Sequence, residues 1–459
     1  MVTIQKYLLK NRRQFVEQLK TLVRFASIST QPDHRRDVLA CVDWLARHFR
    51  MLGLDVKLYP TKGNPLILAC APHSHDTNAP RVLIYGHYDV QPPEPFELWE
   101  TPPFKPVVRD GKLFGRGASD NKGQFFAHVK AVEAYLKTGT PLPANVTFLI
   151  EGEEEVGSAN LMSFVKQHAK QLRADYIIVS DTSMFSKNQP TLTYATRGIV
   201  GMEVRVDGPS RDLHSGVFGG SVANPATVLS QLLASCVGAD GHIRIAGFYA
   251  GVKPIAAWER RMWQRLAFSS RAYRKFLGVP ALDGEKGFTP LEQRWARPTF
   301  EINGLTSGYQ GPGGKTIVPA WAIAKISCRV VPDQRADRVF QAVKRHLHRH
   351  CPKSVRLTII GDHTPSFFTA PDGPGARAAL TALERTFHRK PVLCREGGSL
   401  PILDVFMRHL RGEIILVGLG LPDDNWHSPN EKMDLANFHR GIAMSVELLR
   451  ELAKPAKRD

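Results

Sequence analysis

Val82-Leu83-Ile84-Tyr85-Gly86-His87-Tyr88-Asp89 is the part of the sequence that says most about the fold. Its first four residues form a continuous apolar run with the length of a buried strand, and the run leads directly to a histidine and an aspartate. Two further runs have the same form: 146–150 leads into a glutamate-rich segment, and 176–179 leads into Ser180-Asp181. Continuous apolar runs are typical of strands that are buried on both faces of an α/β sheet. The sequence therefore predicts an α/β fold whose strands end on acidic or histidine side chains.

Helical periodicity alternates with these strands. Apolar residues recur at helical spacing over 34–52, 122–137 and 159–171, and again over 374–388 before an apolar run at 414–417. The pattern predicts a mixed, mostly parallel sheet flanked by helices. We expect this domain to be discontinuous, with residues 1–198 and 364–459 forming a metal-binding catalytic domain.

The intervening segment has a different character. Residues 200–206 alternate between apolar and polar side chains, as in a half-exposed strand. Together with the segments that follow, they predict the order β-α-β-β-α-β, which is typical of a ferredoxin-like layer. We therefore expect residues 199–363 to form an inserted α+β lid or dimerisation domain. The stretch 241–297 has no assigned element.

The length and composition are those of a globular protein with two domains. The 459 residues exceed what one ordinary core holds, and 43% of them are hydrophobic. No apolar run approaches the ~18 residues of a membrane span, and the N-terminal segment lacks the apolar core of a secretory signal. The six cysteines are scattered without a CxxC pair, which argues against a disulfide framework. We therefore expect a cytoplasmic protein without a membrane partner.

The charge is strongly basic, because 61 Lys and Arg residues against 43 Asp and Glu residues give a formal net charge of +18. A nucleic-acid partner is one interpretation of such a charge. The basic residues are spread along the chain, however, and the dense stretch 335–349 has the apolar spacing of a helix whose cations face solvent. We therefore expect no nucleic-acid partner. A positive field would instead attract anionic substrates.

The residues after the predicted strands are the ligand types of a metal site. His87 and Asp89 are two residues apart, so that on an extended segment the aspartate can orient a metal-binding histidine. Asp120 precedes a predicted helix, where a simple N-cap is the alternative. Glu153, Glu154 and Glu155 are either a solvated acidic turn or carboxylates neutralised by cations. Nitrogen and oxygen ligands of this kind suit Zn²⁺, Co²⁺ or Mn²⁺.

Seven stretches, in order along the chain, carry a resemblance to a known family. The chain resembles the co-catalytic zinc metallopeptidase family, which includes carnosinase-type dipeptidases, glutamate carboxypeptidases, acetylornithine deacetylase and succinyl-diaminopimelate desuccinylase. The stretches are GHYDVQP (86–92), GRGASDNKG (115–123), EGEEEVGS (151–158), SDTSMF (180–185), RDLHSGVFGG (211–220), CREGGSLP (394–401) and HSPNEK (427–432). Those at 211–220 and 394–401 are most similar to the carnosinase-like dipeptidases.

The resemblance implies roles for individual residues. His87 and Asp181 would hold one divalent ion, Glu155 and His427 the other, and Asp120 would bridge both. The peptide bond after Asp120 is often cis in the family. Glu154 would be the general base, Asp89 would orient His87, and Glu153 is an additional acid beside them. The two ions are most commonly Zn²⁺ in this family, with Mn²⁺ or Co²⁺ as alternatives.

The carnosinase-like subgroup further implies a homodimer formed through the lid. In that subgroup a lid histidine, matched here by His214, reaches the active site of the partner subunit. Thr316, Arg329 and Ser399 match substrate-binding residues, the first two at the substrate carboxylate. The residues alone also favour Arg329 as an outward-facing side chain, because it alternates with the apolar Ile326, Cys328 and Val330.

The resemblance implies a metal-dependent hydrolase that cleaves the amide bond of dipeptides or related small peptides, with metal-activated water and Glu154 as base. Two alternatives remain. An N-acyl amino acid deacylase of the same family would share the metal chemistry and differ in its pocket. A non-catalytic binding protein of the same fold would normally have lost ligands, whereas every expected ligand is present here.

Overall fold

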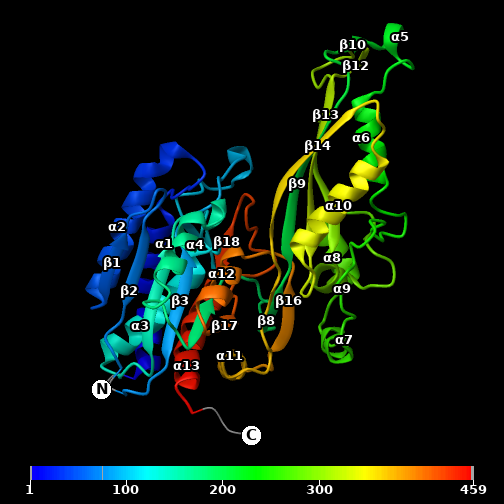
Figure 1. Cartoon of the computed structure of the whole chain (residues 1–459). Coiled ribbons are helices and arrows are strands. Elements are labelled where there is room, and N and C mark those ends of the chain that lie inside the picture. The colour runs from blue at the N-terminus through cyan, green and yellow to red at the C-terminus, as the bar shows by residue number, and fades with distance from the viewer. Residues whose placement is uncertain (1–2, 75, 456–459) are drawn as a thin grey trace. The chain divides into compact units, whose positions relative to one another are not determined.

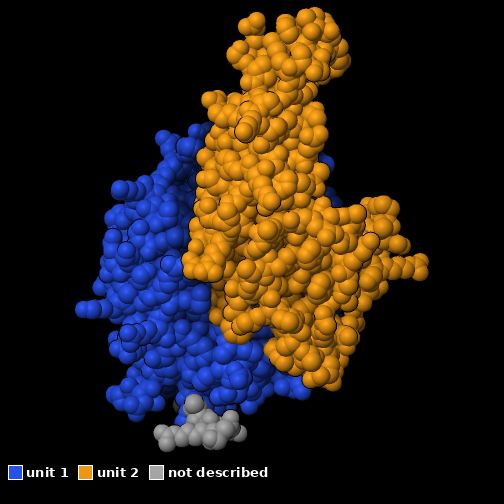
Figure 2. Space-filling model, turned by 45° about the vertical axis from the view of Figure 1, so that its right-hand side comes forward, with its two compact units in different colours: residues 1–194, 369–394, 401–459 blue, residues 195–368, 395–400 orange. Residues whose placement is uncertain are grey.

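The computed structural model of the chain describes residues 3–74 and 76–455. The chain divides into two compact units (Figures 1 and 2). Unit 1 comprises the residues up to Tyr194, the segment 369–394 and the residues from Pro401 onward, and unit 2 comprises Ala195–Phe368 and Arg395–Leu400. The two units differ from the predicted division, since the short segment 395–400 groups with unit 2. It stays a prediction that 1–198 and 364–459 form a catalytic domain and 199–363 a lid domain.

Unit 1 is built on a mixed sheet whose central strands are parallel (Figure 1). Antiparallel strands flank the centre on both sides. The predicted α/β class, with a mixed, mostly parallel sheet, is confirmed. In spatial order the strands are β1 (Asp55–Tyr59), β2 (Leu66–Cys70), β6 (Asn145–Glu151), β3 (Arg81–His87), β7 (Tyr176–Val179), β17 (Glu413–Leu416) and β8 (Thr191–Thr196), with β16 (Val392–Glu396) also pairing with β8. The last two residues of β8 belong to unit 2, where they pair with β15 (Phe367–Phe368).

Helices cover both faces of this sheet. Neighbouring residues of β3 point in opposite directions: Ile84 belongs to the main core, whereas the Tyr85 ring contacts Phe406 of α12 at 5.6 Å between centroids. The helix α3 lies within the core, and its residues from Lys122 to Tyr135 are buried. The helices of unit 1 are α1 (Ile4–Val23), α2 (Arg35–Met51), α3 (Lys122–Thr138), α4 (Ala159–Gln167), α11 (Pro374–Phe387), α12 (Pro401–His409) and α13 (Leu435–Leu452), with 3₁₀ turns at Pro32–His34, Phe96–Leu98 and Glu154–Val156.

A small antiparallel sheet links the loops of unit 1. It has the order β18-β5-β4, formed by Lys432–Asp434, Lys112–Phe114 and Val107–Arg109. Lys432 pairs with Phe114, so the segment before β18 lies beside the segment after β5. These two segments contain the stretches HSPNEK and GRGASDNKG, which the sequence analysis singled out.

Unit 2 has the predicted ferredoxin-like arrangement. Its antiparallel sheet has the order β11-β13-β9-β14, formed by Thr299–Ser307, Trp321–Val330, Gly198–Asp207 and Arg356–Thr364. The helices α6 (Pro225–Ala234) and α10 (Ala336–His350) pack against this sheet. A two-stranded ribbon is formed by β10 (Leu213–His214) and β12 (Ile317–Val318), and α5 (Ser215–Phe218) follows β10.

Several elements differ from the predicted ones. The helix predicted for 159–171 ends at Gln167, because His168 leaves the helical conformation and its ring stacks on Phe164. The unassigned stretch 241–297 forms α7 (Ala257–Gln264), α8 (Ser270–Leu277) and α9 (Pro290–Ala296), in which Trp263 contacts Trp295 at 5.3 Å between ring centroids. Among the described residues, no helix has the length and apolarity needed to cross a membrane.

Candidate active site

The expected metal ligands follow the carboxyl ends of neighbouring parallel strands. β3 ends at His87, β6 leads into the turn with Glu154 and Glu155, and β7 is followed closely by Asp181. His427 lies in the loop after β17, with a φ of 58°. Because β6, β3, β7 and β17 are adjacent and parallel, their ends bring these side chains to one edge of the sheet.

Asp120 lies between two histidines. Its Oδ1 is 3.3 Å from His87 Nε2, and its Oδ2 is 2.9 Å from His427 Nε2. Asp181 Oδ2 is 3.7 Å from His87 Nε2, and Glu155 Oε2 is 3.6 Å from His427 Nε2. The structure thus gathers two half-sites that share Asp120. In each half-site, three ligand atoms lie within 4.8 Å of one another.

The cluster concentrates carboxylates in a buried place. Burial raises the pKa of Glu155 to about 8 and raises the pKa of Glu154 well above its usual range. The hydrogen bond with Asp120 raises the pKa of His427 to about 9. Burial opposes ionisation of Asp120, but the hydrogen bond with His427 and the nearby His87 outweigh it and lower the pKa of this aspartate. A divalent cation would offset the repulsion among these carboxylates.

His87 has the geometry of a metal ligand. Its Nδ1 lies 3.1 Å from the main-chain oxygen of Asp89 and 3.3 Å from Asp89 Oδ1, so Nδ1 is placed to donate a hydrogen bond to Asp89. Its Nε2 is buried, faces Asp120 and Asp181, and has no hydrogen-bond partner within the described part of the chain. An unpaired imidazole nitrogen beside two carboxylates is a suitable donor for Zn²⁺. The residues present therefore fit a metal site.

Asp89 also holds the acidic turn. Its Oδ1 accepts a hydrogen bond from the Glu154 N–H at 3.3 Å, and its Oδ2 accepts one from the Glu155 N–H at 3.2 Å. Glu153 turns away, because its carboxylate accepts from the Asn64 N–H and from Asn160 Nδ2. Of the three consecutive glutamates, only Glu154 and Glu155 group with His87 as candidate ligands among the described residues.

Two amide side chains that the sequence analysis did not single out contact the ligands. Asn121 Nδ2 donates to Asp181 Oδ1 at 2.7 Å, and Gln91 Nε2 donates to Glu155 Oε2 at 2.8 Å. Both lie within the motif stretches: Asn121 directly follows Asp120, and Gln91 lies two residues after Asp89. A polar residue beside an expected ligand was the available signal, because ligating carboxylates are usually held by a further hydrogen bond. The peptide bond between Asp120 and Asn121 is cis.

The expected substrate-binding residues lie at two separate places in unit 2. His214 and Thr316 are exposed beside the β10–β12 ribbon, where the Ser215 N–H donates to the Thr316 oxygen at 3.0 Å. Figure 1 shows this ribbon beyond one end of β13, and Arg329 lies near the other end. From Trp321 to Arg329, β13 spans about 26 Å at about 3.3 Å per residue. One chain therefore does not bring Thr316 and Arg329 together.

Arg329 and Ser399 do meet. Arg329 Nη1 donates to Ser399 Oγ at 2.9 Å, and Ser399 Oγ donates to the Arg197 oxygen at 2.7 Å. Burial, together with the nearby Arg329 charge, lowers the pKa of Arg197 to about 10. Arg329 is half-buried on β13, between the buried Cys328 and Val330, as its phase in the strand predicted. A carboxylate would relieve the repulsion between the two guanidinium groups.

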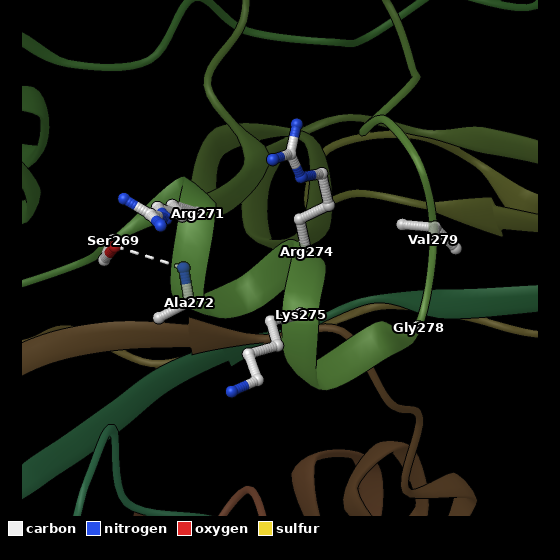
Figure 3. Close-up of a pocket in the computed structure, with 7 residues that line it drawn as sticks. All are labelled: Ser269, Arg271, Ala272, Arg274, Lys275, Gly278 and Val279. Atoms are coloured by element: carbon white, nitrogen blue, oxygen red, sulfur yellow. Dashed lines mark hydrogen bonds between the residues drawn. The ribbon is translucent and has the colours of Figure 1, made fainter.

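Unit 2 also contains a hollow that includes none of the expected site residues. It has a volume of about 670 Å³ and is lined by Ser269, Arg271, Ala272, Arg274, Lys275, Gly278 and Val279. The Ser269 Oγ caps α8 by accepting from the Ala272 N–H. Figure 3 shows that Arg271 and Arg274 point away from Lys275, so the three cations do not converge on one point.

A sheet edge that gathers histidine and carboxylate ligands around a shared aspartate is typical of metal-dependent hydrolases. Residues 83–451 match the pattern of "Peptidase family M20/M25/M40". The chain belongs to this peptidase family.

Relatives and solved structures agree with this assignment. The chain is 32% identical to a "Cys-Gly metallodipeptidase dug1" of Schizosaccharomyces pombe, over 97% of this chain and 96% of the relative. It is 32% identical to a human "Beta-Ala-His dipeptidase", over 98% of this chain and 92% of the relative. The crystal structure of human carnosine dipeptidase 1 superposes with a TM-score of 0.87 at 31% identity, covering 98% of each chain. The predicted resemblance to carnosinase-like metallodipeptidases is confirmed.

Proposed function

We propose that the protein hydrolyses the amide bond of dipeptides or related small peptides with two bound divalent metal ions. The observation that carries the proposal is the position of Asp120, whose two oxygens face His87 and His427. A further carboxylate, Asp181 or Glu155, completes each half-site. The relatives named as dipeptidases support the substrate class, since they match over nearly the whole chain.

In this proposal His87 and Asp181 would hold one ion, Glu155 and His427 would hold the other, and Asp120 would be shared by both. Imidazole and carboxylate ligands favour Zn²⁺, and the same set accepts Mn²⁺ or Co²⁺. When bound, such ions polarise a substrate carbonyl and lower the pKa of water.

Glu154 acts as the general base and then as the general acid. It accepts the proton of the attacking water and returns it to the leaving amine. Its burial, which raises the pKa, makes it a carboxylate that can hold a proton near neutral pH. Asp89 keeps Glu154 in place through the main-chain N–H and orients the ring of His87.

We further propose that the site is completed by a second copy of the chain. Arg329 and Ser399 lie together, whereas His214 and Thr316 lie at the opposite end of β13. In a homodimer, His214 and Thr316 of one subunit would serve the site of the other. There His214 would stabilise the developing oxyanion, while Thr316, together with Arg329 and Ser399, would bind the substrate carboxylate.

A cytoplasmic location also remains our proposal, supported by six cysteines that are all free thiols.

A substrate screen tests the proposal directly. Purified protein would be stripped of metal and reconstituted separately with Zn²⁺, Mn²⁺ and Co²⁺, and the bound metal would be counted. We expect two ions per chain and the highest kcat/KM on free dipeptides. A dipeptide with an amidated C-terminus is the matched control, and we expect it to be cleaved far more slowly because it lacks the carboxylate for Arg329. A preference for N-acetyl amino acids would instead establish the deacylase alternative.

A further inference from the structure

The loop that carries Asp120 is held by one carboxylate from a distant part of the chain. Glu431 is fully buried, and it lies more than 300 residues beyond this loop. Its Oε2 accepts from the Gly117 N–H and from Arg116 Nη1, both at 2.8 Å. Its Oε1 accepts from the N–H groups of Ser119 at 2.9 Å and Asp120 at 3.0 Å. Each carboxylate oxygen therefore receives two hydrogen bonds.

The segment that contains Glu431 also contacts the Asp120 loop at Ser119. Ser119 Oγ donates to Asp424 Oδ2 at 2.7 Å and accepts from Trp426 Nε1 at 2.9 Å. Asp424 and Trp426, which precede His427, and Glu431, which follows it, thus all contact the loop that carries Asp120. His427 itself lies 2.9 Å from Asp120 Oδ2. One short segment therefore supplies a ligand of one half-site and also holds the main chain of the shared aspartate.

We propose that Glu431 is a positioning residue that keeps Asp120 between the two half-sites and so sets how tightly the second metal ion is bound. The inference rests on the proposed metal site. Glu431 does not touch the ligand side chains, since its contacts are with main-chain N–H groups and with Arg116. It acts by fixing the main-chain direction at Asp120, from which both carboxylate oxygens reach the histidines.

The chemistry of the contacts makes the charge and the length of Glu431 necessary. All four of its partners are hydrogen-bond donors, so only a group that accepts at both ends satisfies them. A glutamine would place an NH₂ group against two donors, which leaves buried N–H groups unpaired. An aspartate would keep the charge but shorten the reach by one methylene group. Both changes should therefore loosen the Asp120 loop, the glutamine more than the aspartate.

The test compares Glu431→Gln with wild type in metal binding and in kinetics. Co²⁺ would be titrated into the metal-free protein and followed by its visible absorption, and Zn²⁺ affinity would be measured against a competing chelator. We expect at least a roughly 10-fold loss of affinity for the second ion, an altered Co²⁺ spectrum and a lower kcat with little change in KM. Excess metal should restore part of the activity.

Glu413→Gln is the matched control, because Glu413 also accepts from two main-chain N–H groups, those of Gly375 and Ala376, away from the ligands. We expect it to bind both ions as wild type does. If Glu431→Gln does not fold, Glu431→Asp decides, with an intermediate loss of affinity expected. Wild-type affinity and spectrum in either folded Glu431 variant would overturn the inference, as would an equal loss in Glu413→Gln. A wild-type protein that binds no metal would instead refute the proposed function.

Discussion

At the residue scale, the site depends on small differences between identical side chains. Glu153 and Glu154 are adjacent, yet Glu153 accepts hydrogen bonds from Asn64 and Asn160, whereas Glu154 groups with the candidate ligands His87 and Glu155. The turn between β6 and α4 places them on different sides, because Asp89 holds the main-chain N–H of Glu154. The resemblance implies Glu154 as the base, and the contacts of the three glutamates set Glu153 apart from Glu154 and Glu155.

The substitution Glu154→Gln should lower kcat by roughly 10²- to 10⁴-fold, the usual contribution of a general base. Metal content should stay at two ions per chain, because the proposed ligands are unchanged. Glu153→Gln is the matched control and should change kcat only a few-fold. Steady-state kinetics on metal-reconstituted protein would measure both. Equal losses in the two variants, or near-wild-type turnover in Glu154→Gln, would contradict the assignment of the base.

At the scale of elements, the helix α3 connects the sheet edge to the core. His128 of this helix is fully buried; its Nε2 lies 2.7 Å from Ser180 Oγ and its Nδ1 lies 2.8 Å from Ser445 Oγ. Ser180 Oγ in turn donates to the main-chain oxygen of Val417. The histidine therefore ties α3 to the residue before Asp181 and to α13. Burial lowers its pKa to about 4.

This pKa predicts how the stability of unit 1 depends on pH. Below pH 6.5 the unfolded chain protonates its histidine while the folded chain keeps His128 neutral, so the unfolded state binds more protons. Stability should then fall as the pH drops from 6.5 towards 4, by about 3 kcal/mol at most from this one residue. Denaturant unfolding across this interval would measure the loss, in excess chelator so that metal release does not contribute.

The substitution His128→Gln should flatten this pH dependence while lowering stability near neutral pH. His409→Gln is the control, because His409 is exposed at the end of α12, and the slope should remain that of wild type. An unchanged slope in His128→Gln would show that other groups cause the acid sensitivity.

At the scale of the whole molecule, the proposed site needs residues that one chain holds apart. Thr316 and Arg329 lie at opposite ends of β13, so both can bind one carboxylate only if a second subunit supplies one of them. The exposed Val217 and Phe218 belong to α5, which begins directly after His214. This segment therefore combines an expected substrate contact with apolar surface.

Mixing two inactive variants tests the shared site. Glu154→Gln and His214→Ala should each be nearly inactive, but a hybrid dimer contains one site with both residues intact. Random subunit exchange should therefore restore roughly a quarter of wild-type activity. The pair Glu154→Gln and Asp181→Asn is the control and should restore none, because both residues belong to one subunit's half of the site. Hybrid dimers that form without recovery of activity would refute the shared site.

Much of the fold followed from local patterns. The apolar runs at 82–85, 146–150 and 176–179 lie within β3, β6 and β7, because a parallel strand buried on both faces is apolar throughout. The alternation at 200–206 lies within β9, which is buried on one face only. Local patterns did not predict the exact ends of the helices or the helices within 241–297. Short helices such as α7 and α8 depend on tertiary contacts for most of their stability.

The class of fold, the order of the main elements and the identity of the candidate ligands can all be predicted from the amino-acid sequence. Local periodicity predicts the fold class and the order of the elements, and the ordered motifs predict the candidate ligands. Packing of the folded chain turns Glu153 away from the cluster, places Asp120 between His87 and His427, and brings Glu431 to the Asp120 loop. These features depend on contacts between residues far apart in the sequence, such as Glu431 and Asp120, which are 311 positions apart. No local pattern encodes such contacts, because they form only when the strands and loops pack together.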